Sequence, residues 1–366
     1  MRSATSSPRA TRYLPQLDGL RAVAVVCVLA FHFIPGVDRY APLGSMGVRL
    51  FFVISGFLIT GILLTWRGRP LAVALKTFYL RRALRIFPVF YFALAAAAAI
   101  NIGPVRETFA WHLTYLSNVY FYLRGDWHGS VSHLWSLAVE EQFYLVWPWL
   151  ILCAPERWLR PAMLAMVAVA PLSRLMFPNP MDSVLPTSCL DALGMGALIA
   201  MAAIHKAAPH KGGPYGVEAG EAGEARVAGV AAVGVAGAVL VAITLAMRYA
   251  AVGGQYQIVG LDFGVSLLSA WLVASAARGF AGAAGRVLSL APIIAVGRIS
   301  YGLYVYHGFT PYLLGRYVPG FMAMAAPIRV GLLVATTALV AMVSWRLLEQ
   351  PFLRLKPAAP LAPLAP

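Results

Sequence analysis

The sequence has few charged residues for its length, and acidic residues are the scarcest of them. Only 12% of its 366 residues are charged, with 14 acidic residues against 29 basic ones. Soluble globular chains usually carry about 25% charged residues. Because 60% of this chain is hydrophobic and its mean hydropathy is +0.74, the composition excludes an ordinary soluble domain.

Cysteine is scarce as well. Cys27, Cys153 and Cys189 lie far apart and follow no metal-binding or redox spacing, so we expect neither a disulfide framework nor a metal site. The sequence also contains no phosphate-binding loop and no dinucleotide-binding glycine pattern. We therefore expect no tightly bound cofactor.

What the sequence does contain is long apolar runs. A stretch of about 20 largely apolar residues is long enough to cross a bilayer as a helix. We predict an all-α fold, a polytopic transmembrane helical bundle with about ten spans. These are expected near residues 17–35, 47–65, 86–103, 133–152, 161–178, 185–204, 227–247, 258–277, 290–314 and 327–347.

The stretch 104–132 is harder to place. It is rich in Tyr, Trp and His, and aromatic side chains favour the membrane interface. We interpret it as an interfacial or re-entrant segment. An eleventh span is the alternative, and it would reverse the orientation of every later helix.

Basic residues are distributed unevenly between the two sides of the predicted bundle. With ten spans and the N-terminus in the cytoplasm, nineteen Lys and Arg lie on the cytoplasmic side. Six lie on the other side, namely Arg39, Arg106, Arg124, Arg174, Arg248 and Arg316. The positive-inside rule therefore places both termini in the cytoplasm. The net charge of +15 then faces the cytosolic leaflet, and no nucleic-acid partner is needed to explain it.

Three regions follow from this topology. Residues 1–13 are expected to be a cytoplasmic tail, 14–352 the transmembrane domain and 353–366 a Pro-rich C-terminal tail. The loop 205–226 is expected to be flexible. We expect no second soluble domain.

Ionisable residues within the apolar runs are the candidate functional residues, because each costs a few kcal/mol at bilayer depth. In RAVAVVCVLAFH, Arg21 and His32 are eleven residues apart. They therefore share one helix face and lie about 16 Å apart along the axis. An imidazole that is simply satisfied by a backbone carbonyl is the alternative to a functional His32.

The stretch HLWSLAVEEQFYLVWP contains two adjacent carboxylates, Glu140 and Glu141. His133 and Ser136 share the face of Glu140, whereas Glu141 points about 100° away. We favour a functional interpretation, in which a carboxylate orients or charges a histidine. A structural ion pair with Arg21 or Arg49 is the alternative.

Two further stretches carry polar groups. FYLRRALRIFP places Arg82 and Arg85 on one helix face at the cytoplasmic mouth of the third predicted span. Their guanidinium groups are suited to phosphate oxygens. Arginines that snorkel to the membrane surface are common at the end of a span and are the alternative. GRISYGLYVYHG makes Ser300 and His307 co-facial. No nucleophile elbow surrounds Ser300, so we favour a hydrogen-bonded packing network between helices.

Together these stretches resemble the acyltransferase-3 family of bacterial integral membrane proteins. LDGLRAVAVVCVLAFHF, GVRLFFVISGFLIT, FYLRRALRIFPVFY, HLWSLAVEEQFYLVWP and ISYGLYVYHG follow the order of the family's signatures, from about Leu14 to Phe352. The resemblance implies a multi-pass protein of the bacterial cytoplasmic (inner) membrane. It also implies transfer of an acyl group, commonly acetyl, from acyl-coenzyme A to a hydroxyl of a sugar or related acceptor.

The resemblance also implies roles for individual residues. The catalytic set would be His32, Glu140 and Glu141, with the imidazole as the base that takes the proton of the acceptor hydroxyl. The acyl-CoA ligands would be Arg21, Arg82 and Arg85. Ser300 and His307 would be supporting residues.

The expected partners are acyl-CoA, the lipid bilayer and a glycan or glycolipid acceptor, such as an exopolysaccharide or lipopolysaccharide. Acylation of a secreted small glycoside such as a macrolide is the second interpretation within this class. A glycan or lipid transporter is the alternative from another class, although the two halves of the chain show no clear repeat. A structural membrane subunit would not need His32 and two intramembrane glutamates.

Overall fold

The computed structural model describes residues 13–177, 179, 181–205 and 221–358. Within these ranges the regular structure is helical and contains no strand, which confirms the predicted all-α class. Most of the predicted N-terminal tail, residues 206–220 of the predicted loop and residues 359–366 of the predicted C-terminal tail lie outside the described residues.

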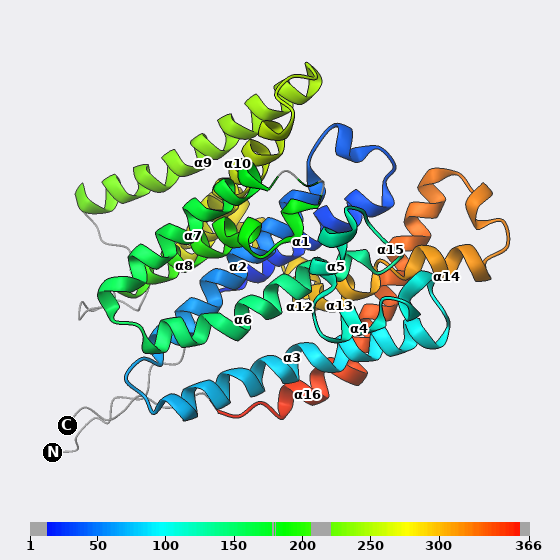
Figure 1. The fold of residues 1–366 in the computed structure, drawn as a ribbon, viewed down its shortest axis with the longest axis horizontal. Helices are drawn as coiled ribbons and strands as arrows, with labels where there is room; N and C mark the ends of the chain where they lie inside the picture. The colour runs from blue at the N-terminus through cyan, green and yellow to red at the C-terminus, as the bar shows by residue number, and fades with distance from the viewer. Residues whose placement is uncertain (1–12, 178, 180, 206–220, 359–366) are drawn as a thin grey trace.

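The long helices form an elongated bundle (Figure 1). They are α1 (Pro15–Phe33), α2 (Leu43–Thr65), α3 (Leu71–Ala99), α6 (Trp135–Cys153), α7 (Glu156–Met176), α8 (Leu190–His205), α9 (Glu221–Tyr249), α10 (Gln255–Arg278) and α15 (Ala326–Ser344). The shorter ones are α4 (Phe109–Leu113), α5 (Ser117–Arg124), α11 (Gly282–Leu288), α12 (Ala291–Arg298), α13 (Ser300–Tyr306), α14 (Thr310–Tyr317) and α16 (Gln350–Arg354).

Eight helices of the described chain are long and apolar enough to cross a membrane, and they overlap eight of the ten predicted spans. The protein is therefore a multi-pass membrane protein. The span predicted at 86–103 is displaced, because its helix α3 begins at Leu71 and so includes Arg82 and Arg85. Of the other two predicted spans, 133–152 is occupied by the single helix α6, which carries the glutamate pair. The count of ten and the side of the membrane on which the termini lie stay predictions.

The predicted span 290–314 is wrong as a single helix, because the structure divides it into α12, α13 and α14. The breaks fall beside Ile299 and Gly308, and Pro311 stands in the first turn of α14. A helix that ends leaves its last carbonyls without intrahelical partners. At the end of α13, the carbonyls of Tyr304 and Val305 accept hydrogen bonds from imidazoles instead.

The aromatic stretch 104–132 holds only short helices, of which α5, with eight residues, is the longest. None of them is long enough to cross a bilayer. The alternative of an eleventh span is therefore wrong, which leaves the interfacial or re-entrant interpretation.

Glycines bring α2 and α8 into close contact at the centre of the bundle. A Cβ atom on Gly56 would lie 2.1 Å from the carbonyl oxygen of Leu193, and one on Gly196 would lie 2.2 Å from that of Val53. Small residues at helix interfaces let backbones approach in this way. The close approach fixes α2 between α8, α1 and α10, and α2 lines both cavities described next.

Candidate active site

An inner cavity of about 90 Å³ lies between α1, α2, α3, α6 and α13. It brings together five residues that the sequence singled out, namely Arg21, Arg82, Arg85, Glu140 and Ser300. These residues come from four helices that are far apart in sequence. Two cationic side chains that were expected at a membrane surface, Arg82 and Arg85, thus line a cavity between helices.

The guanidinium groups of Arg82 and Arg85 have neither a hydrogen bond nor an ion pair among the described residues. The Arg82 guanidinium lies 5.9 Å from the ring centroid of Tyr144 and 6.0 Å from that of Phe78. Each group keeps its N–H donors available, and such donors match phosphate oxygens. Arg21 differs, because Asp18 accepts a hydrogen bond from it at 2.9 Å.

The two glutamates of α6 have different surroundings. Glu140 lines the inner cavity and accepts a hydrogen bond from the Ser55 hydroxyl at 2.6 Å, while Tyr144 donates to the same hydroxyl at 3.1 Å. Glu141 lines neither cavity, and one of its buried carboxylate oxygens has no partner in the described chain. The 100° separation of their faces therefore gives only Glu140 access to the inner cavity.

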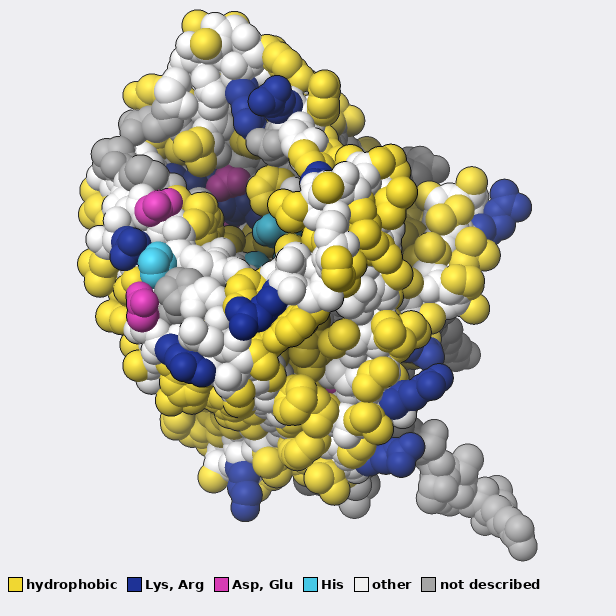
Figure 2. Space-filling view, turned by 90° about the vertical axis from the view of Figure 1, so that its right-hand side faces the viewer, with side chains coloured by type: hydrophobic (Ala, Val, Ile, Leu, Met, Phe, Trp, Pro, Cys, Tyr) yellow, Lys and Arg dark blue, Asp and Glu magenta, His cyan; other side chains and the backbone are white. Residues whose placement is uncertain are grey.

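An outer cavity of about 400 Å³ lies beyond the inner one. Its lining includes His32 of α1, Arg49 of α2, His133, Trp135 and Asp262 of α10. Figure 2 shows a hollow in which basic, acidic and histidine side chains are visible, as this lining requires. Polar and aromatic groups therefore converge on a space several times larger than the inner cavity.

The ring of His32 is held by a backbone group. Its Nδ1–H donates to the carbonyl oxygen of Val28 at 2.9 Å, and since a carbonyl only accepts, the neutral ring has its lone pair on Nε2. A carboxylate was expected to orient this histidine. The structure instead gives that orienting role to Val28 and places Glu140 in the other cavity.

Three histidines form a cluster beside the outer cavity. The ring centroid of His307 lies 4.7 Å from that of His32 and 4.4 Å from that of His133. His307 is fully buried, donates through Nδ1 to the carbonyl oxygen of Tyr304 at 2.6 Å, and has no partner for Nε2 among the described residues. His133 donates through Nε2 to the carbonyl oxygen of Val305 at 3.1 Å. His307 therefore contacts the candidate base itself, and no hydrogen bond joins it to the co-facial Ser300 among the described residues.

The two cavities meet at three side chains. Val48 and Phe52 of α2 and Tyr304 of α13 line both of them. The Tyr304 hydroxyl donates to the carbonyl oxygen of His133 at 2.7 Å and accepts from Ser136 at 2.5 Å. Arg21 lines the inner cavity and His32 the outer one, so the helix that carries both runs past the junction.

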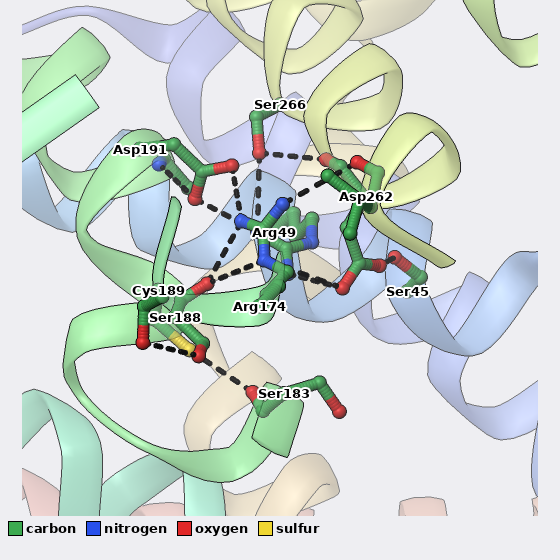
Figure 3. A network of polar contacts seen from close by, with 12 residues as sticks. Ser45, Arg49, Arg174, Ser183, Ser188, Cys189, Asp191, Asp262 and Ser266 are labelled. Carbon is green, nitrogen blue, oxygen red and sulfur yellow. Dashed lines mark hydrogen bonds and ion pairs between the residues drawn. The ribbon is translucent and has the colours of Figure 1, made fainter. Parts of the chain in front are cut away.

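A buried network of ion pairs forms one wall of the outer cavity (Figure 3). Arg49 donates to Asp191 at 2.9 Å and to Asp262 at 2.6 Å. Arg174 pairs with both of these carboxylates, and Ser45 donates to Asp262 at 2.8 Å. Two cations thus balance two anions drawn from α2, α7, α8 and α10, as buried charges require.

This network corrects two expectations. The partners of Arg49 are aspartates of α8 and α10, so the alternative that paired it with Glu140 or Glu141 is wrong. Arg21 pairs with Asp18 and with neither glutamate. Arg174 was counted among residues outside the membrane spans, but it lies in α7 with only 1% of its surface exposed.

Sequence reasoning missed several polar residues of this region. Asp191 and Asp262 stand within predicted spans and would have been found by treating every intramembrane charge as a candidate. Glu349 is 5% exposed, has an unpartnered carboxylate oxygen among the described groups and lies in a π-helical turn, Trp345–Glu349. No periodicity in the sequence indicates that turn.

The family described as an acyltransferase domain matches residues 14–346, which is most of the chain. The chain is thus a membrane protein of acyltransferase type, and it belongs to the acyltransferase-3 family. This confirms the resemblance found in the sequence motifs.

Individual relatives match a shorter part of the chain. It is 38% identical over 151 residues to peptidoglycan O-acetyltransferase OatA of Listeria monocytogenes, covering 37% of this chain and 24% of the relative. It is also 38% identical to the putative peptidoglycan O-acetyltransferase YrhL of Bacillus subtilis, and that match covers 37% of this chain and 23% of the relative. A putative O-acetyltransferase of Staphylococcus aureus (strain COL) is 36% identical, covering 37% and 24%. The match thus spans about a quarter of the length of these curated relatives, and no solved structure matches.

Proposed function

We propose that this chain transfers an acyl group, acetyl in the simplest case, from acyl-coenzyme A to a hydroxyl of a cell-surface or exported glycan. The observation that carries the proposal is the pair of adjoining cavities. One is lined by guanidinium groups without partners, and the other by an imidazole whose Nε2 lone pair is available. Family membership supports the reaction class.

The donor would enter through the inner cavity. Arg82 and Arg85 would bind its phosphates, with Arg21 held nearby by Asp18. The pantetheine arm would then extend through the junction, so that the thioester carbonyl reaches the outer cavity. Snorkelling alone would direct these guanidinium groups to the membrane surface, whereas both line a cavity between helices.

The transfer step needs one base and no covalent intermediate. The acceptor oxygen attacks the thioester carbonyl carbon while Nε2 of His32 takes the hydroxyl proton, and the new C–O bond replaces the C–S bond. The imidazolium then gives its proton to the departing thiolate. The products are the glycan ester and free coenzyme A, and the histidine returns to its starting state.

The acceptor is proposed to be a glycan because the relatives with assigned substrates are named as peptidoglycan O-acetyltransferases. The outer cavity offers aromatic side chains, among them Trp127, Trp135 and Tyr304, and such groups suit a sugar ring. Peptidoglycan, an exopolysaccharide and a lipopolysaccharide all present sugar hydroxyls. A secreted small glycoside presents the same groups and is the alternative acceptor.

Mass spectrometry of surface glycans from cells with and without the gene tests this proposal. We expect ester-linked acyl groups on one glycan to disappear with the gene and to return with the wild-type chain but not with His32→Ala. Identical acylation of all glycans in both strains would refute the proposal. Accumulation of an unexported glycan without loss of acylation would favour a transporter.

A further inference from the structure

We propose that Val48, Phe52 and Tyr304 form a filter that selects the acyl chain by its length, an inference that rests on the proposed function. A donor whose phosphates lie at Arg82 and Arg85 can present its thioester to His32 only by crossing from one cavity to the other. These three side chains are the residues that line both cavities among the described part of the chain.

The acyl group is the leading end of the donor, so it meets this junction before any other part does. The outer cavity, at about 400 Å³, has room for more than an acetyl group, whereas the inner one measures about 90 Å³. Selection by length therefore falls on the junction and not on the cavity where transfer takes place.

The junction residues are held firmly. Val48 and Phe52 lie one turn apart on α2 and so share a face, and Phe52 is 1% exposed, with its ring edge against Trp135 at a centroid distance of 6.2 Å. Tyr304 is fixed by its hydrogen bonds to Ser136 and to the carbonyl of His133. A hydrophobic pocket distinguishes chains that differ by one methylene by about 10- to 200-fold, and we expect the junction to select within the same range.

The test compares acetyl-, propionyl- and butyryl-CoA with the full-length protein in lipid nanodiscs, using coenzyme A release in the presence of a soluble glycan acceptor. We expect Val48→Ala to raise the ratio of kcat/KM for butyryl-CoA to that for acetyl-CoA by about tenfold. Val48→Ile, which narrows the junction, should lower the same ratio. It gives a second measurement if Val48→Ala folds poorly.

The matched control is Val53→Ala. Val53 lies on the same helix, is fully buried and lines neither cavity. Val53→Ala therefore removes the same two methyl groups as Val48→Ala, but away from the junction. Its ratio should equal that of the wild type. Acetyl transfer by all variants with an unchanged ratio would overturn the filter alone. Absence of transfer from every thioester by the wild-type protein would overturn the proposed function, and the filter with it.

Discussion

The hydrogen bond from His32 to Val28 lets the local geometry of one helix fix the tautomer of the candidate base. Because the acceptor is the carbonyl one turn earlier on the same helix, the ring needs no distant residue to fix its tautomer. The ring lies beside His307, whose own Nδ1 is fixed by Tyr304 in the same way. Two imidazoles are thus set with their Nε2 atoms free of hydrogen bonds to the described chain.

Replacing His32 by Ala is expected to lower acyl transfer by at least about 100-fold, because a positioned general base contributes roughly that much or more. The protein should still insert and show near-wild-type thermal stability, since the His32 ring is exposed to the cavity. Turnover with acetyl-CoA measures the effect. His128→Ala, which removes a histidine outside both cavities, is the control, and wild-type turnover in His32→Ala would contradict the base role.

The lysine variants Arg82→Lys and Arg85→Lys keep the charge but lose the planar fork of donors. We expect KM for the acyl-CoA donor to rise by about tenfold in each, because a charge-assisted hydrogen bond contributes about 1.5–3 kcal/mol. Steady-state kinetics at saturating acceptor measures this. An unchanged KM with a lower yield of inserted protein would make these arginines determinants of membrane topology.

The two glutamates are expected to differ when each is changed to Gln. Glu140→Gln should reduce turnover strongly with near-normal thermal stability, because Glu140 lines the same inner cavity as Arg82 and Arg85. Glu141→Gln should have a small effect on turnover, because Glu141 lines neither cavity. Equal and mild losses in both variants would remove this motif from the active site.

The broken segment α12–α14 shows how an interruption in a helix can build a site. Its breaks release carbonyls that bind His133 and His307, and they place Gly308 directly against the His133 ring. A Cβ at Gly308 would lie 2.2 Å from Cε1 of that ring. Only glycine leaves room for the imidazole there.

Gly308→Ala is therefore expected to displace His133 and, through its contact with His307, to shift His32. Turnover should fall by up to about 100-fold, since small misplacements of a catalytic group have effects of that size. Gly315→Ala is the control, because no heavy atom lies within 4 Å of a Cβ at that position. Turnover and the melting temperature should be measured together. Equal turnover in the two variants would separate the histidine cluster from catalysis.

The helices were predictable where the hydrophobic pattern is continuous, and less so where it is interrupted. Most of the long helices overlap predicted spans, because a run of about 20 apolar residues has the length of a helix that crosses a bilayer. The break at Gly308 was missed although Gly308 and Pro311 are local signals for a helix end, whereas the contact of Gly308 with His133, 175 positions earlier, could not be read from the sequence.

The residues that line the site could be predicted from the sequence, but the ion pairs and hydrogen bonds that they form could not. Arg21, Glu140 and His32 were identified as intramembrane polar groups and Arg82 and Arg85 as candidate phosphate ligands, and the structure places all five on two adjoining cavities. Which charges pair depends on how helices pack, and no spacing within one helix reveals that. The pairing of Arg49 with Asp191 and Asp262 is the clearest case.

The ion-pair network joins four helices of the bundle, so its loss should affect the whole molecule. Asp191→Asn leaves the buried Arg174 and Arg49 with half of their compensating charge, and we expect a loss of about 3–5 kcal/mol in stability. The melting temperature in detergent should fall markedly. Asp126→Asn, at an exposed position outside the network, should leave it unchanged, and equal melting temperatures would show that the network contributes little.

The same network affects the order in which the helices can assemble during synthesis. Arg49 leaves the ribosome 142 residues before Asp191 and 213 residues before Asp262. A lone guanidinium costs a few kcal/mol at bilayer depth, so the nascent α2 gains the stabilising charges of its partners only after α8 and α10 have been made. The wall that this network gives to the outer cavity is therefore completed only when the chain has been made as far as α10.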